Sequence, residues 1–102
     1  MFGANKSRFA TFGVISRTPG VMIDALWSII DNNLQGVFPL QNLLRFEFRN
    51  HDGQLQVVFT EKGLDAELAV DLDYKYLDNL PASVYAYDDG NVQTILLEDE
   101  LE

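Results

Sequence analysis

A chain of 102 residues with a net charge of −9 and 47% hydrophobic residues has the size of one domain and enough apolar side chains for a core. It has no cysteine, which excludes disulfide frameworks, zinc ribbons and thiol nucleophiles and suits a reducing bacterial cytoplasm, where we expect the protein. No signal peptide or membrane-spanning run is recognisable, so we expect a single domain over residues 1–102, with flexible ends at 1–7 and 98–102.

Residues 8–15, RFATFGVI, are rich in β-branched and aromatic side chains and predict a first strand. Thr18 is then expected to be the N-cap of a helix that begins with Pro19, because proline needs no amide hydrogen in the first turn. The helix is predicted to run for about three and a half turns. It should end in the segment 32–36, which contains asparagines and the helix-ending Gly36.

The middle of this helix carries only three polar residues, Asp24, Ser28 and Asp31, whose spacing places them on one narrow stripe. Its apolar surface is therefore wider than one face of a sheet usually covers. Packing in the core is the first expectation for this surface. A homodimer interface is the alternative, because buried interfaces are rich in Trp and Met. The residues of this possible apolar interface are Met22, Ile23 and Trp27.

The rest of the chain alternates apolar and polar side chains, which is the pattern of half-buried strands. Strands are predicted at residues 43–50 and 54–59, joined by a tight Asp-Gly turn, and at residues 67–76. Residues 83–97 are typical of a second hairpin. The predicted fold class is therefore α+β, with a single helix packed on a mainly antiparallel sheet of about five to six strands.

The sequence DDGN at residues 88–91 allows two interpretations, a cation-binding loop or a hairpin turn. An EF-hand loop needs glycine at its sixth position and glutamate at its twelfth, whereas counting from Asp88 gives Gln93 and Asp99. Asp-Gly pairs are typical of tight hairpins, because glycine readily adopts a positive φ. We therefore predict a two-residue turn here, and no metal or other cofactor.

The residues that could support catalysis are few. His51 is the only histidine, and it lies beside Asp52 in a turn, where adjacent side chains rarely point at one another. Asp71 and Asp73 share a strand face roughly 6–7 Å apart, a separation used by acid–base pairs. Their alternation with apolar residues indicates solvated carboxylates, without the burial that raises the pKa of a general acid. We expect a protein that is not an enzyme and has no catalytic residues.

The negative charge is concentrated near the end of the chain, since residues 61–102 hold 12 of the 16 acidic residues and only 2 of the 7 lysines and arginines. Such a surface repels phosphate, so direct nucleic-acid binding is disfavoured and a basic protein partner is favoured. The acidic face expected to bind this partner comprises Glu67, Asp71, Asp73, Asp88, Asp89, Glu98, Asp99 and Glu100.

Four segments carry short motifs: RFATFGV (8–14), LWSIID (26–31), RFEF (45–48) and VYAYDDGNVQTILL (84–97). Together they resemble a domain family of unknown function, numbered nine-sixty, from Gram-positive bacteria and their mobile elements. The resemblance implies a fold and carries no catalytic assignment. Small acidic phage and plasmid proteins similar to this chain include anti-CRISPR inhibitors of type II effector nucleases, whose channels are strongly basic.

Two functional hypotheses follow from the charge and the resemblance. The first is an inhibitor encoded by a mobile element, which binds a basic nucleic-acid-handling protein such as a type II CRISPR nuclease. The alternative is a housekeeping scaffold or interaction domain that homodimerises through its apolar helix. The first hypothesis depends on the acidic face, and the second depends on Trp27 and its neighbours.

Overall fold

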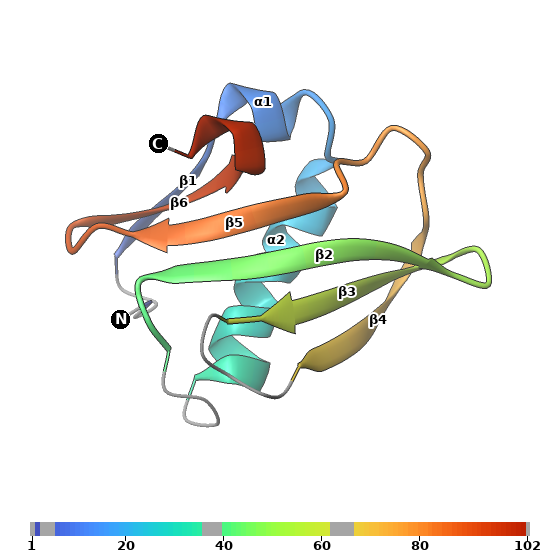
Figure 1. Ribbon diagram of the computed structural model, residues 1–102, viewed down its shortest axis with the longest axis horizontal. Helices are drawn as coiled ribbons and strands as arrows, with labels where there is room; N and C mark the ends of the chain where they lie inside the picture. The colour runs from blue at the N-terminus through green and yellow to red at the C-terminus, as the bar shows by residue number, and fades with distance from the viewer. Residues whose placement is uncertain (1, 3–5, 36–39, 62–66, 102) are drawn as a thin grey trace.

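The computed structural model describes residues 2, 6–35, 40–61 and 67–101. Six strands form one twisted sheet, and helix α2 (Gly20–Ile29) lies against one face of this sheet (Figure 1). The fold is therefore of the predicted α+β class, with one main helix. The strands are β1 (Ser7–Ala10), β2 (Leu43–His51), β3 (Gln54–Thr60), β4 (Leu68–Lys75), β5 (Ser83–Asp88) and β6 (Val92–Leu97).

The strands follow the order β1-β6-β5-β2-β3-β4 across the sheet. Four neighbouring pairs are antiparallel, whereas β1 and β6 run parallel, with Ser7 opposite Val92 and Ala10 opposite Ile95. The sheet is therefore mixed, and the prediction of a mainly antiparallel sheet missed this pairing. Turn residues reveal which strands are joined by hairpins, but the pairing of the first strand with the last leaves no local signal.

Both predicted hairpins form. Between β2 and β3, Asp52 and Gly53 have φ angles of 54° and 87°, as a two-residue turn with positive φ at both positions requires. Between β5 and β6 the loop has three residues, 89–91, and Gly90 takes a φ of 102°. The Asp-Gly pairs thus mark both turns, and the second loop is one residue longer than predicted.

The first strand ends earlier than predicted, at Ala10. The Oγ1 atom of Thr11 accepts a hydrogen bond from the amide of Val14 (3.3 Å), and this bond caps a short helix, α1 (Phe12–Ile15). The first and last side chains of α1 are 83% and 56% exposed. The predicted strand over residues 8–15 is therefore wrong after Ala10, because the threonine cap overrides the β-propensity of the side chains that follow.

Helix α2 begins one residue later than predicted, because Pro19 rather than Thr18 is its N-cap and accepts the first amide hydrogen bonds. Thr18 is buried, and its hydroxyl has no hydrogen-bond partner among the described residues. The helix widens into a π-helical turn, η1 (Ile30–Leu34), close to the predicted end; Gly36 lies outside the described residues. None of the helices in the described ranges has the length and apolar character that crossing a membrane requires.

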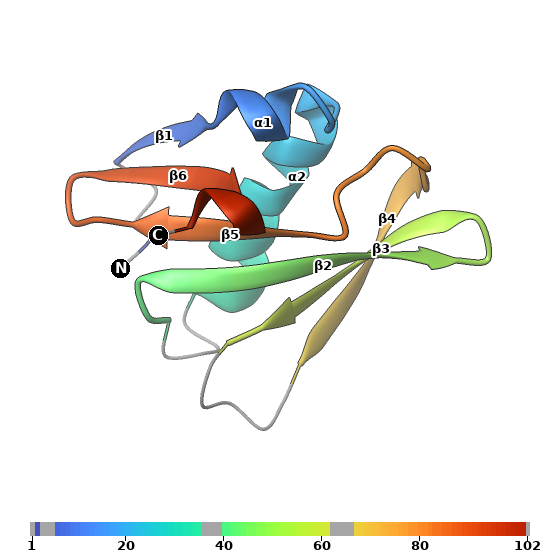
Figure 2. The same cartoon turned by 45° about the horizontal axis from the view of Figure 1, so that its top comes forward.

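The core lies between α2 and the sheet (Figure 2). Phe46 of β2 and Phe59 of β3 are 0% and 1% exposed, and their ring centroids are 5.7 Å apart. Leu26 and Ile30 are fully buried on the helix side. The predicted alternation of β2 is confirmed, since Leu44, Phe46 and Phe48 are buried while the side chains between them are more exposed.

The described residues near both ends of the chain make contacts with the rest of the fold, and residues 1, 3–5 and 102 of the predicted flexible ends lie outside the described residues. Phe2 is fully buried, and Ser7 begins β1. At the other end, Glu98–Glu100 forms a 3₁₀ turn, η2, where the hydroxyl of Thr11 donates a hydrogen bond to Oε1 of Glu100 (2.7 Å). The two ends therefore pack onto the rest of the sheet and onto α1.

Candidate functional site

Strand β4 forms one edge of the sheet and presents a row of carboxylates. Asp71 and Asp73 alternate with side chains that pack on the core, and Glu67 lies just before the strand; all three are exposed. The Oδ1 atom of Asp71 lies 3.3 Å from Nδ1 of His51 and accepts a hydrogen bond from Nε2 of Gln56 (3.0 Å). This edge therefore places three of the predicted acidic residues together.

A groove with a volume of about 520 Å³ lies between β4 and α2. Its apolar lining includes the half-buried Val70 and Leu72 of β4 and the exposed Val21 of α2. Asp24 and Asp73 add two carboxylates, and none of its described lining residues is a lysine or arginine. The groove thus combines apolar walls with negative charge.

His51 lies on the surface, with a side chain that is 55% exposed. Its ring approaches Asp71 at 3.3 Å and Gln56 at 3.5 Å, and such exposed contacts are worth little in water. Within the described part of the chain, no group of three or more His, Asp or Glu side chains is placed to hold a metal ion. His51, Gln56 and Asp71 therefore form a polar cluster on the surface beside β4.

Asp88 was predicted to belong to the acidic face, but it is fully buried. Its carboxylate accepts hydrogen bonds from the amides of Phe2 (2.7 Å) and Gly90 (2.8 Å) and from Nε2 of Gln93 (3.3 Å), and it forms an ion pair with Lys6 (2.9 Å). The prediction is wrong because the alternation of β5 turns this position toward the helix-covered face of the sheet. Asp88 ties the N-terminal segment to the hairpin and is not available to a partner.

The same contacts decide the pKa of Asp88. Burial by itself raises the pKa, but hydrogen bonds from the amide of Phe2, the ammonium group of Lys6 and the amide of Gly90 outweigh burial and lower the pKa to about 2. The carboxylate therefore stabilises the fold fully above its ordinary pKa of 3.8, and this contribution is lost as the pH falls through about 2.

We expect acidification from about pH 5 to pH 1 to remove about 2–3 kcal/mol of unfolding free energy through Asp88 alone. The direct measurement is an NMR titration of the Asp88 carboxyl carbon, with an expected midpoint near pH 2. A midpoint at the ordinary value of 3.8 or above would contradict the anchoring contacts.

Arg8 joins β1 to helix α2. Its guanidinium carbon lies 4.8 Å from the ring centroid of Trp27, and its two terminal nitrogens donate to Asp31 (2.8 and 2.6 Å), which lowers the pKa of that carboxyl. Its Nε donates to Oε1 of Gln93 (2.8 Å), and Gln93 in turn donates to Asp88. Three of the four segments with recognisable motifs thus meet in one partly buried polar network.

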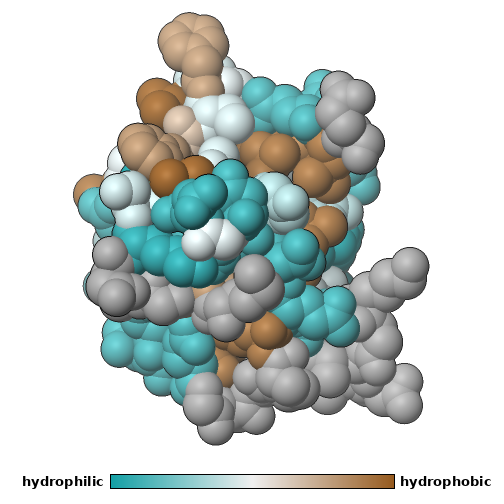
Figure 3. Space-filling model, turned by 90° about the vertical axis from the view of Figure 1, so that its left-hand side faces the viewer, coloured by the Kyte–Doolittle hydropathy of each residue, from teal (hydrophilic) through white to brown (hydrophobic). Residues whose placement is uncertain are grey.

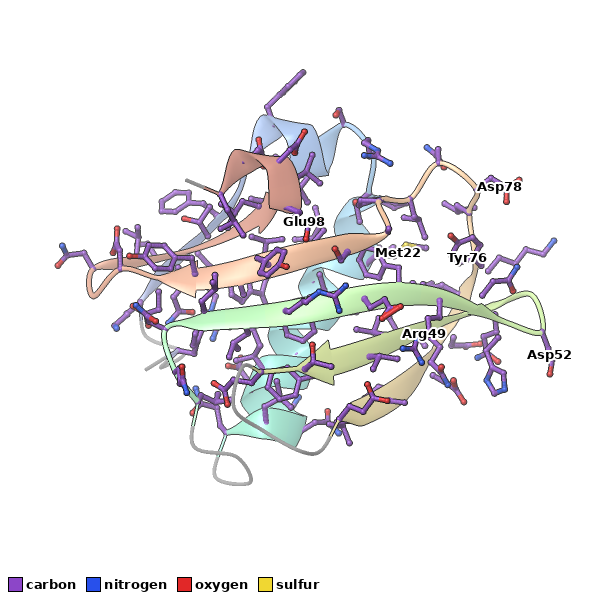
Figure 4. All side chains as sticks on the ribbon, in the orientation of Figure 1. Met22, Arg49, Asp52, Tyr76, Asp78 and Glu98 are labelled. Atoms are coloured by element: carbon purple, nitrogen blue, oxygen red, sulfur yellow. The ribbon has the colours of Figure 1, made fainter. Side chains whose placement is uncertain are left out.

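The side chains predicted as a possible apolar interface belong to the core. Met22, Ile23 and Trp27 are only 4%, 9% and 8% exposed and share one buried cluster with the sheet. Met22 lies behind the sheet on the helix side (Figure 4). This burial agrees with the first expectation for these residues, packing in the core, since the helix lies against a twisted sheet of six strands. The exposed residues of α2 are Gly20, Val21, Asp24 and Ser28.

The other predicted acidic residues lie away from β4. Asp89 is exposed in the β5–β6 loop, where its Oδ1 accepts two backbone hydrogen bonds of the turn. Glu98–Glu100 follows β6, which is separated from β4 by three strands. Figure 4 shows Glu98 above β5, whereas Asp52 and Asp78 lie toward the right-hand end of the molecule. The eight predicted acids therefore do not form one face.

Sequence reasoning missed two apolar surfaces. One is the groove beside β4, where Val21 and Tyr74 are 54% and 38% exposed. The other exposes Phe9, Phe12 and Ile15, and Figure 3 shows apolar side chains at the top of the molecule, where α1 lies. The prediction of a strand over residues that form α1 concealed the second surface. The groove depends on the distance between a helix and an edge strand, for which the sequence has no signal.

The chain is similar to a family of proteins and to a solved structure. The family described as "Staphylococcal protein of unknown function (DUF960)" matches residues 7–100. A crystal structure of a protein of unknown function from Enterococcus faecalis has 42% sequence identity and a TM-score of 0.97, and the match covers 99% of this chain and 95% of that chain. No curated protein matches the chain. These similarities concern the sequence and the fold, and neither description gives an activity.

Proposed function

Since the chain belongs to the DUF960 family of staphylococcal proteins of unknown function, whose description gives no activity, we propose a function from its surface. The protein is a small binding module, not an enzyme, and it recognises a basic protein through the acidic edge formed by Glu67, Asp71 and Asp73. The observation that carries the proposal is the exposure of these carboxylates along one edge strand, beside a groove that adds Asp24.

Proteins that handle nucleic acids are the natural class of partner, because their channels carry clustered lysines and arginines that accept phosphate. An acidic edge on a rigid sheet can occupy such a channel in place of the phosphate backbone. Inhibition of a type II CRISPR nuclease in the bacterial cytoplasm is one specific form of this proposal, supported by the sign of the charge and by the absence of cysteine.

Reversal of two charges by Asp71→Lys plus Asp73→Lys is expected to weaken partner binding by about 100-fold, because like charges then face each other across the interface. The partner is recovered by a pull-down from a host lysate, and its affinity is measured with both proteins at low and physiological ionic strength. Guide-loaded and guide-free type II CRISPR nucleases are titrated in parallel to test whether the partner is such a nuclease.

The matched control is Glu98→Lys plus Asp99→Lys, which changes the net charge by the same amount at η2, separated from β4 by three strands. We expect this control to bind within about threefold of the wild type, as for charges outside the contact area. Binding that is indifferent to salt and to the β4 reversal, or weakened equally by both double variants, contradicts the proposed acidic edge.

A further inference from the structure

Strand β4 has one open side. In the part of the chain that the structure describes, β4 pairs only with β3. Two hydrogen bonds show which backbone groups face β3. Nε2 of Gln54 donates to the carbonyl of Leu72 (2.6 Å), and the amide of Tyr76 just after the strand donates to the carbonyl of Gly53 (3.0 Å). Leu72 and Tyr76 therefore direct their backbone groups toward β3.

Successive residues of a strand point their N–H and C=O groups to opposite sides, so the residues that alternate with Leu72 face the open edge. The pairing of β4 with β3 is regular from Leu68 to Asp71 and shifts register between Asp71 and Lys75. Within the regular part, Ala69 and Asp71 present amides and carbonyls along the side of β4 that faces away from β3. Such a row of backbone groups is a template for another strand. A strand added there would place every second side chain between β4 and α2.

The two faces of an added strand would meet different chemistry. On the helix side, the groove offers the apolar surfaces of Val21 and Leu72. On the other side lies the carboxylate of Asp71, whereas Asp73 also lines the groove; Lys75 is the basic residue of β4. The groove accommodates aliphatic side chains, and the carboxylates accommodate lysine or arginine.

We propose that β4 and the groove beside it bind an extended segment of a partner protein, in which apolar residues alternate with lysine or arginine, as a seventh strand of the sheet. This inference rests on the proposed function and specifies which part of the basic partner is recognised. A second copy of this chain is a poorer occupant, because pairing β4 with β4 would bring two rows of carboxylates together.

The probe is a labelled peptide of alternating valine and lysine with eight residues, the length of β4. It is titrated against the full chain by fluorescence anisotropy, and hydrogen exchange of the protein is measured by NMR. We expect slower exchange of the amides of Ala69 and Asp71 in the complex. We also expect at least tenfold weaker binding when alternate peptide amides are N-methylated, or when glutamate replaces lysine in the peptide.

Ala69→Pro tests the backbone contact without a change in charge. It removes one outward-facing amide, and proline is tolerated on an edge strand when its nitrogen faces away from the ladder. We expect at least tenfold weaker peptide binding. The matched variant Ala69→Val keeps the amide and should bind as the wild type does. If Ala69→Pro fails to fold, the N-methylated peptide applies the same test from the ligand side.

The two proposals fail in different ways. Peptide binding that is lost in Asp71→Lys plus Asp73→Lys, but is indifferent to Ala69→Pro and to N-methylation, overturns strand addition and leaves the acidic edge standing. Failure of the wild type to bind any basic partner or peptide overturns both. A dimer that light scattering detects in the wild type and not in Ala69→Pro assigns the edge to a second copy and also overturns the peptide proposal.

Discussion

Replacing Trp27 by alanine is expected to lower the free energy of unfolding by about 3–5 kcal/mol, the usual cost of removing a large aromatic side chain from a core. Trp27 is 8% exposed, and its ring also receives the guanidinium of Arg8 at 4.8 Å. Because Trp27 is the only tryptophan, unfolding in urea must be followed by far-UV circular dichroism instead of fluorescence.

The control is Val21→Ala on the same helix, where the side chain is 54% exposed; the expected change is below about 0.5 kcal/mol. Light scattering of the same variants addresses the homodimer hypothesis. If Trp27→Ala kept its stability and turned a dimer into a monomer, Trp27 would have to be an interface residue, and its placement in the core would be wrong.

Replacement of Asp88 by asparagine is expected to cost about 3 kcal/mol, because it leaves buried donors without a charged acceptor. The carboxylate accepts hydrogen bonds from the amides of Phe2 and Gly90, from Gln93 and from Lys6. An asparagine has one acceptor oxygen, and its NH₂ group would point at other donors. Urea unfolding at neutral pH measures the loss, and the variant should also lack the loss of stability near pH 2 that Asp88 confers.

Asp89→Asn is the matched control, since the same chemical change occurs one residue further along the chain. The Oδ1 atom of Asp89 accepts hydrogen bonds from the amides of Asn91 and Val92, and an asparagine oxygen can accept both. We expect a change below about 0.5 kcal/mol. Equal losses in the two variants would show that net charge, and not the buried network, governs the effect.

Local patterns predicted most of the sheet because strands that pair in a hairpin are adjacent in the sequence and are joined by a recognisable turn. Alternation and Asp-Gly turns located β2, β3, β5 and β6, and the apolar helix was found to within one residue at its start. The errors arose where a capping hydrogen bond or a long-range strand pairing outweighed the local secondary-structure propensity. Thr11 caps a helix inside a β-favouring segment, and β1 pairs with a strand at the far end of the chain.

For the candidate site, alternation was informative where it was applied. It predicted that Asp71 and Asp73 of β4 are solvated, and both side chains are exposed in the structure. The same rule places Asp88 on the face of β5 that carries Val84 and Ala86, which are both buried. Alternation could therefore have predicted the burial of Asp88, but Asp88 was assigned to the acidic face because of its charge. No sequence pattern could predict the groove, because the groove arises from the spacing between α2 and an edge strand.

The parallel pairing of β1 with β6 has a consequence for the order in which the fold is assembled. Strands β2 and β3 are linked by two residues and can pair as soon as both are synthesised, whereas Ser7 must wait for Val92. The first strand made can therefore pair only after the last strand has been made, and until then β1 has no partner strand. A nascent chain that stalls before β6 would expose β1 as an unprotected strand.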